Sequence, residues 1–115
     1  MSMSIFDNDT IEEISFVCNF LKEDSEEALC ELLTHFKGLK TLNLSGNEIT
    51  RGLGYFFIKL KELYRINKTK LEILVLNKCI LDETSFYELS ELIKSKFCKL
   101  KKLYLNLNNI DNSTN

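Results

Sequence analysis

Residues 39 to 49 read LKTLNLSGNEI, and the spacing of the apolar residues in this stretch decides the fold. Leu42 and Leu44 alternate with polar neighbours, which is the period-two pattern of a short strand buried on one side. Asn47 follows, and an Asn side chain in a turn can bond backbone groups of its own loop and of the neighbouring loop. The stretch therefore predicts a strand that ends in an Asn-stabilised turn.

The same pattern occurs four times along the chain. Each copy has apolar residues at its first, fourth, sixth and eleventh positions and Asn or Cys at its ninth. The copies begin at Ile11, Leu39, Leu71 and Leu100, so successive starts lie 28, 32 and 29 residues apart. The ninth positions are Asn19, Asn47, Cys79 and Asn108. Regular spacing of this kind predicts a repeat architecture in which each unit covers its neighbour's core.

Between the predicted strands the apolar spacing becomes helical. Residues 28, 29, 32, 33 and 36 share one helical face. A second helix is expected from Leu53 to Arg65, where it carries a cluster of four aromatic residues. Ser85 and Glu88 have the spacing of a capping box at the start of a third helix. Strands that alternate with helices predict an α/β fold with parallel strands.

The four copies resemble the leucine-rich repeat family, and their spacing with Asn or Cys at the ninth position is similar to its ribonuclease-inhibitor-like subclass. The resemblance covers residues 11–115, which leaves residues 1–10 as an N-terminal extension or cap. It implies a right-handed leucine-rich-repeat solenoid, with short parallel strands on the concave face and helices on the convex face. The fourth copy is expected to be incomplete, because only residues 111–115 follow its pattern.

The residues that usually carry catalysis are scarce in this chain. It has one histidine, His35, near the expected end of a helix, and Gly52 and Gly54 lack the rest of a phosphate-binding loop. Four cysteines lack the CxxC spacing of a redox or metal site. They are Cys18, Cys30, Cys79 and Cys98. We therefore expect no enzyme activity, no cofactor and no metal.

The resemblance implies that ligands dock on the concave strand face. If the repeated leucines point into the core, the third, fifth and seventh positions of each copy point away from it. Ile73, Val75 and Tyr104 would form an apolar centre between charged ends, a composition typical of protein-binding patches. The predicted partner-binding residues are Thr41, Asn43, Ile73, Val75, Asn77, Lys102, Tyr104 and Asn106.

These features predict a protein–protein interaction module whose partner cannot be identified from the sequence. One alternative is a GTPase-activating or other enzyme-regulatory leucine-rich-repeat protein. Another is a fragment of a larger sensor or effector. A third alternative, which we do not favour, is nucleic-acid binding through the lysines near the C-terminal end. For the apolar residues of the face, the simpler interpretation is that the β-branched residues only stabilise the sheet.

Charge is distributed unevenly along the chain. Residues 1–38 carry a net charge of −7 and residues 39–115 a net charge of +5. Five lysines gather near the C-terminal end without an aromatic stacking platform, so we do not expect nucleic-acid binding. They are Lys94, Lys96, Lys99, Lys101 and Lys102. The uneven charge would steer copies head to tail, so we expect self-association through the C-terminal edge.

The sequence also bears on location. No apolar run approaches the roughly 20 residues of a membrane span. The first ten residues lack the basic and then apolar layout of a signal peptide. We therefore expect no membrane partner and a cytoplasmic protein with reduced cysteines.

Overall fold

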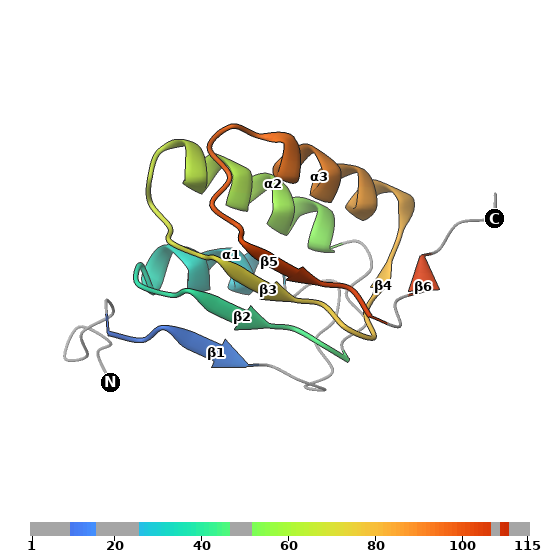
Figure 1. Cartoon of the computed structure of the whole chain (residues 1–115), viewed down its shortest axis with the longest axis horizontal. Helices are drawn as coiled ribbons and strands as arrows, with labels where there is room; N and C mark the ends of the chain where they lie inside the picture. Colours follow the sequence, from blue (N-terminus) through green and yellow to red (C-terminus); the bar gives the residue numbers. More distant parts are fainter. Residues whose placement is uncertain (1–9, 16–25, 47–51, 107–108, 111–115) are drawn as a thin grey trace.

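Short strands and longer helices alternate along the chain (Figure 1). The structure is a computed structural model that describes residues 10–15, 26–46, 52–106 and 109–110. The predicted extension at residues 1–10 lies outside this part, apart from Thr10. The elements are β1 (Glu13–Ser15), α1 (Glu26–His35), β2 (Thr41–Asn43), α2 (Gly52–Arg65), β3 (Ile73–Val75), β4 (Ile80–Leu81), α3 (Glu83–Lys94), β5 (Lys102–Tyr104) and β6 (Asn109–Ile110). The predicted α/β class is confirmed.

Four strands form one parallel sheet in the order β1-β2-β3-β5. Their register places Ile14, Leu42, Leu74 and Leu103 in a single row across the sheet. This is the row obtained by aligning the four sequence copies at their fourth positions. The strands β4 and β6 form a second, two-stranded parallel sheet.

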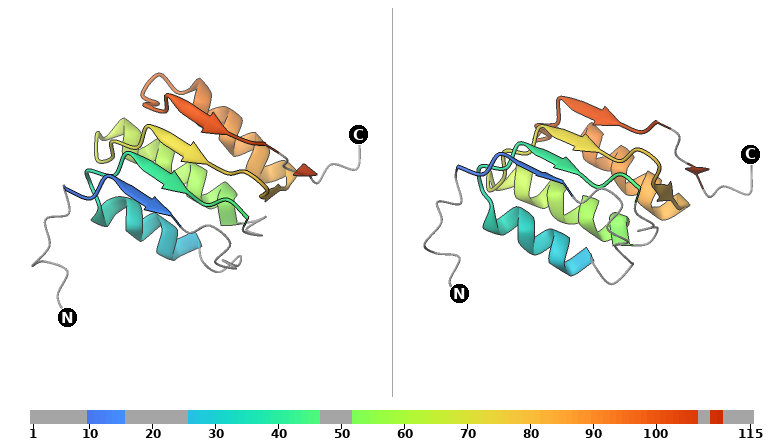
Figure 2. Two further views of the ribbon diagram at one scale, coloured as in Figure 1. Left: turned by 60° about the horizontal axis from the view of Figure 1, so that its bottom comes forward. Right: turned by 90° about the horizontal axis from the view of Figure 1, so that it is seen from below.

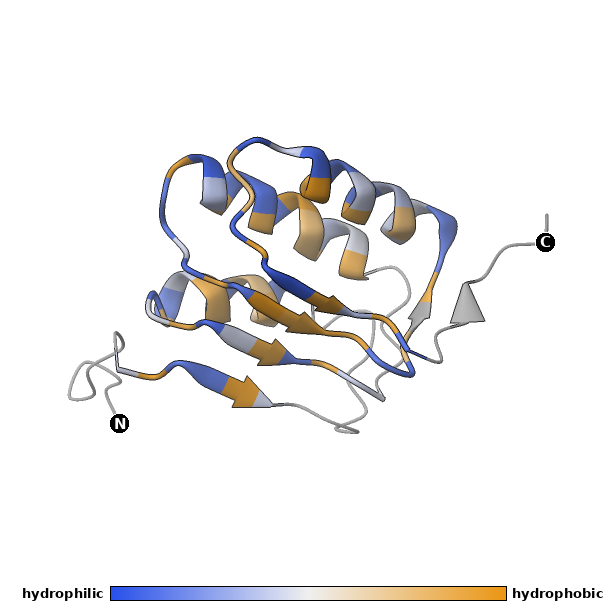
Figure 3. Cartoon of the chain, in the orientation of Figure 1, coloured by the Kyte–Doolittle hydropathy of each residue, from blue (hydrophilic) through white to orange (hydrophobic). Residues whose placement is uncertain are grey.

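The three helices lie on one side of the four-stranded sheet, with α2 between α1 and α3 (Figures 1 and 2). Figure 3 shows the hydrophobic parts of the helices turned toward the strands. Among the described residues, no helix covers the opposite side, which we call the helix-free face. The fold is thus two layers, with the core between sheet and helices.

Leucines in and next to the two middle strands, β2 and β3, form the centre of this core. Six of them have no exposed surface, because each unit has a neighbour on both sides. They are Leu39, Leu42, Leu44, Leu71, Leu74 and Leu76. In α1, Leu29 and Leu33 are buried, whereas Ala28 is exposed, so the predicted helical face is narrower than the sequence suggests.

The helix α2 matches its predicted span to within one residue. Three of its four clustered aromatics, Phe56, Phe57 and Tyr64, are buried, while Tyr55 is 52% exposed. The helix ends at Arg65, and Asn67, two residues further on, has a φ of 60°. This conformation lets the backbone N–H groups of Asn67 and Lys68 donate to carbonyls of the last helical turn.

The capping box predicted at Ser85 is wrong. The helix α3 begins three residues earlier, with Asp82 as its N-cap. Ser85 donates its backbone N–H to Asp82 Oδ1 at 2.7 Å, and its side chain is buried in the first turn. Asp and Ser are both strong N-cap residues, and Asp82 directly follows β4, so the chain turns into the helix there.

The turns that follow β2 and β3 share one backbone conformation. Gly46 and Lys78 occupy the eighth position of their sequence copies, and both have positive φ, at 78° and 60°. After the second of these turns, the Cys79 thiol donates to the Leu44 carbonyl of the preceding unit at 3.2 Å. The predicted roles of Asn19, Asn47 and Asn108 fall outside the described residues.

One buried hydrogen bond joins α2 to the start of the third strand unit. Tyr64 donates its hydroxyl to the Leu71 carbonyl at 2.6 Å. Burial raises the pKa of the Tyr64 phenol far above its usual value, so this group remains a donor. The bond fixes the end of the helix against the strand that follows it.

Replacing Tyr64 by Phe should therefore destabilise the fold by about 1 to 2 kcal/mol, because the buried Leu71 carbonyl loses its donor. Tyr55→Phe is the matched control, since this tyrosine lies on the same helix but is half exposed. Urea unfolding followed by circular dichroism measures both variants. Equal midpoints for the two would contradict the structural role of the Tyr64 hydroxyl.

Candidate binding face

The helix-free face carries all eight residues that the sequence predicts as partner-binding. The pairing of strands places Glu13, Thr41, Ile73 and Lys102 in one row and Ser15, Asn43, Val75 and Tyr104 in the next. Asn77 and Asn106 lie two residues after the ends of β3 and β5, which contribute to these rows. The structure therefore brings the predicted residues together on one surface.

Apolar side chains occupy the part of this face between β3 and β5. Ile73 and Val75 are half-buried, and Tyr104 is 39% exposed beside its strand partner Val75. Cross-strand pairs of aromatic and β-branched residues stabilise a sheet. The exposed part of Tyr104 nevertheless leaves an apolar surface. We call Ile73, Val75 and Tyr104 the apolar strip.

A chain of side-chain hydrogen bonds runs along one border of the face. Asn43 Oδ1 accepts a hydrogen bond from the backbone N–H of Ser45 at 3.0 Å, and Ser45 Oγ accepts one from the backbone N–H of Asn77 at 3.0 Å. Asn77 Oδ1 accepts in turn from the backbone N–H of Asn106 at 2.7 Å. These oxygens extend the backbone ladder beyond the strand ends. The sequence pattern predicts Asn43 and Asn77 only as partner contacts, so this second role is new.

A row of alternating charges lies at the opposite border, where the strands begin. Lys40 Nζ lies 3.9 Å from Glu12 Oε2, and Lys101 Nζ lies 3.4 Å from Glu72 Oε2. Backbone bonds between consecutive members of the row hold Glu12, Lys40, Glu72 and Lys101 in register. The sequence contains this signal, an E-K-E-K alternation at the second position of the four copies. We call these four residues the charge row.

Most of the C-terminal lysines already have partners within the chain. Lys94 pairs with Glu91 at 3.6 Å, and Lys96 lies 5.4 Å from the centre of the Phe97 ring. Lys99 bonds to the Asn67 side chain, and Lys101 belongs to the charge row. Four of the five lysines thus have a contact within the chain. That the chain does not bind nucleic acid stays a prediction.

His35 and the cysteines do not come together into a reactive site within the described part of the chain. His35 packs edge-on against Phe36 with ring centres 4.9 Å apart, and its buried Nε2 has no hydrogen-bond partner among the residues that the structure describes. Cys30 and Cys79 are buried, and Cys98 is half-buried. Within the described residues, no group of three or more His, Cys, Asp or Glu side chains could hold a metal ion.

Comparison with known proteins leaves the family open: no family model matches the chain, and no curated protein matches it. Of the three described helices, none combines the length and the apolar character needed to cross a membrane. The geometry of the helix-free face is therefore the basis for any functional conclusion.

Proposed function

We propose that this chain is a leucine-rich-repeat solenoid of the ribonuclease-inhibitor-like type that binds a protein partner on its helix-free face. The observation that carries the proposal is the apolar strip, which lies on a sheet face that no described helix covers. We propose a binding role without chemistry of its own.

The repeat assignment is supported by equivalent geometry at equivalent positions. The four strands pair in the register of the sequence copies. The turns after β2 and β3 each have a residue with positive φ at the eighth position of the copy. Cys79 stands at the ninth position and donates from one unit to the carbonyl of another. This is the role that the repeat pattern assigns to Asn.

Cys79→Asn tests this assignment. If the ninth position is built for a polar donor, an amide should be accepted there with a loss of under about 1 kcal/mol, although Cys79 is 1% exposed. Leu33→Asn is the matched control, because Leu33 has no exposed surface on the packed side of α1 and Asn is similar to it in shape. Burying an amide there should cost about 2 kcal/mol or more. Thermal unfolding of both variants measures the difference, and an equal loss in both would count against the repeat assignment.

The helix-free face is suited to a partner because a partner that covered it would leave few polar atoms without hydrogen bonds. The side-chain oxygens of Asn43, Ser45 and Asn77 already accept hydrogen bonds from within the chain. Their desolvation by a partner would therefore cost less than that of unpaired groups. The charge row provides the polar rim that surrounds the apolar centre of most protein interfaces.

Tyr104 is the residue of the strip best placed to anchor a partner. It combines a large ring with a hydroxyl and lies at the edge strand, where 39% of its surface is exposed. Aromatic residues of this kind dominate the binding energy of many interfaces. Ile73 and Val75 would complete the contact beside it.

We also propose a cytoplasmic location. The bond from Cys79 to Leu44 requires the reduced thiol as a donor. Intracellular compartments keep thiols in this state, whereas secreted proteins tend to oxidise them.

Substitution of the strip should weaken partner capture without unfolding the chain. Tyr104→Ala should weaken capture at least tenfold, about 1.4 kcal/mol or more, because the anchor is lost. Val75→Lys should act in the same way by placing a charge in the strip. Tyr87→Ala is the control, since Tyr87 is 60% exposed on α3, away from this face.

The measurement is affinity capture from the source cells, with mass spectrometry to identify proteins that depend on Tyr104 and Val75 but not on Tyr87. Circular dichroism checks that each variant is folded. Capture that survives both strip substitutions, or that fails equally with Tyr87→Ala, would show that partners bind elsewhere.

A further inference from the structure

The sheet has an apolar end at β5. Leu100, Leu103 and Leu105 are only partly buried, whereas the equivalent Leu71, Leu74 and Leu76 have no exposed surface. The difference arises because, in the described part of the chain, β3 has paired neighbours on both sides and β5 pairs with β3 alone in its sheet. Edge strands with exposed backbone groups and leucines favour addition of another strand.

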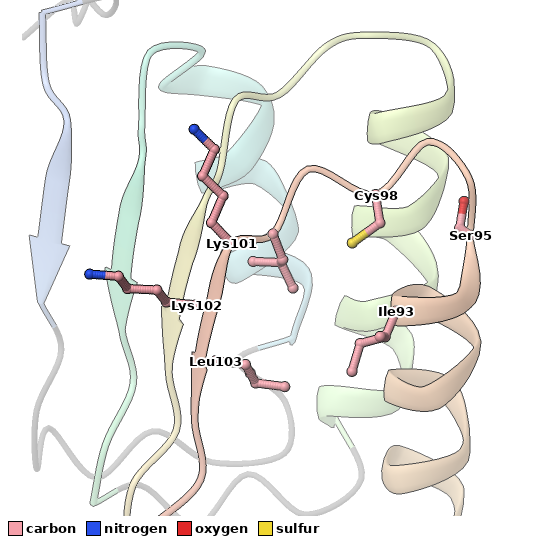
Figure 4. Close-up of a pocket in the computed structure, with 7 residues that line it drawn as sticks. Ile93, Ser95, Cys98, Lys101, Lys102 and Leu103 are labelled. Carbon is pink, nitrogen blue, oxygen red and sulfur yellow. The ribbon is translucent and has the colours of Figure 1, made fainter.

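A hollow opens beside these leucines. It has a volume of about 280 Å³ and lies between β5 and the C-terminal end of α3. Figure 4 shows Leu103 pointing from β5 toward α3, and Ile93 and Cys98 pointing toward β5 from the other side of the hollow, whereas Lys102 points away from it. Ile93 is 52% exposed and adds to the uncovered apolar surface. The end of the sheet can therefore receive further apolar side chains.

The charges at the two ends of the sheet are opposite. The charge row begins with Glu12 at the β1 end and finishes with Lys101 at the β5 end. The adjacent row on the helix-free face likewise begins with Glu13 and finishes with Lys102. All four of these terminal residues are exposed.

We propose that the β5 end of the sheet docks the β1 end of a second copy of this chain. A parallel strand added at β5 would repeat the geometry by which β1, β2, β3 and β5 already pair. Glu12 of the second copy would follow Lys101 in the charge row, and Glu13 would follow Lys102. Ile14, itself only partly buried, would extend the row that ends at Leu103.

Charge favours this head-to-tail arrangement over the two symmetric ones. Pairing two β5 ends would bring together two ends that carry Lys101 and Lys102. Pairing two β1 ends would bring together two ends that carry Glu12 and Glu13. Surfaces of like charge repel one another, so neither symmetric contact gains the electrostatic attraction of the head-to-tail contact. The head-to-tail contact satisfies both ends, and because it is not self-complementary it can add copies without closing. It involves the ends of the sheet and does not depend on a partner at the helix-free face.

Sedimentation velocity over a protein concentration series tests the contact. At low salt the weight-average mass should rise continuously past that of a dimer, and it should fall when salt is raised to about 0.5 M, where exposed charges are screened. A strictly monomeric mass at high concentration in low salt would overturn the proposal. A mass that stops at the dimer would indicate a closed, symmetric contact and would overturn it as well.

Charge reversal then assigns the two surfaces. The double variants Glu12→Lys with Glu13→Lys, and Lys101→Glu with Lys102→Glu, should each associate at least tenfold more weakly than the unmodified chain. A mixture of the two variants should regain association, because each end again meets its opposite. Lys68→Glu with Lys70→Glu is the control, since both lysines are exposed outside the sheet ends and the net charge changes equally.

Recovery in the mixture also shows that the variants are folded. If reversal of Glu12 and Glu13 leaves association unchanged, the contact does not use the β1 end and the proposal is wrong. The same conclusion follows if the Lys68 and Lys70 control loses as much association as the Lys101 and Lys102 variant, because the effect would then reflect net charge alone.

Discussion

Parallel hydrogen bonding between the four strands fixes the position of every other feature of this molecule. It places Ile14, Leu42, Leu74 and Leu103 in one row on the side of the helices, and because side chains alternate along a strand, the flanking residues are set on the other side. A shift of one residue would exchange the two sets and bury the polar rows. The leucines therefore determine both the core and the composition of the helix-free face.

The side chains at the strand ends protect this register where the strands stop. Three-residue strands form few backbone hydrogen bonds. The side chains of Ser45 and Asn77 continue the ladder into the turns by accepting hydrogen bonds from backbone N–H groups of the next unit. At the other end, the backbone bonds from Glu72 to Lys40 and from Lys101 to Glu72 begin the pairing before the assigned strands. A short strand can thus be held firmly enough to present a defined surface.

The parts of this structure that could be predicted are those that depend on periodic apolar residues. The strand register follows from repeated leucines, and the span of α2 follows from helical spacing between two strands. The start of α3 could not be chosen from residue types, because Asp82 and Ser85 both favour an N-cap and only the position of β4 decides between them. The hydrogen bonds accepted by the side chains of Ser45 and Asn77 require the neighbouring turn to be in place. The charge row is visible in the sequence, but its meaning depends on strands that lie side by side in space.

A stack of equivalent units has no internal reason to stop, and this explains why its ends differ from its middle. Each inner unit is covered by the units on both sides, so its leucines are fully buried. The unit at β5 has equivalent leucines and the same strand geometry, but among the described residues it has a neighbour on one side only, and its core residues are partly exposed. The alternation of charge along the row makes the two ends chemically distinct, with carboxylates at one and ammonium groups at the other. The same row of strands therefore has a broad helix-free face and two ends of opposite charge.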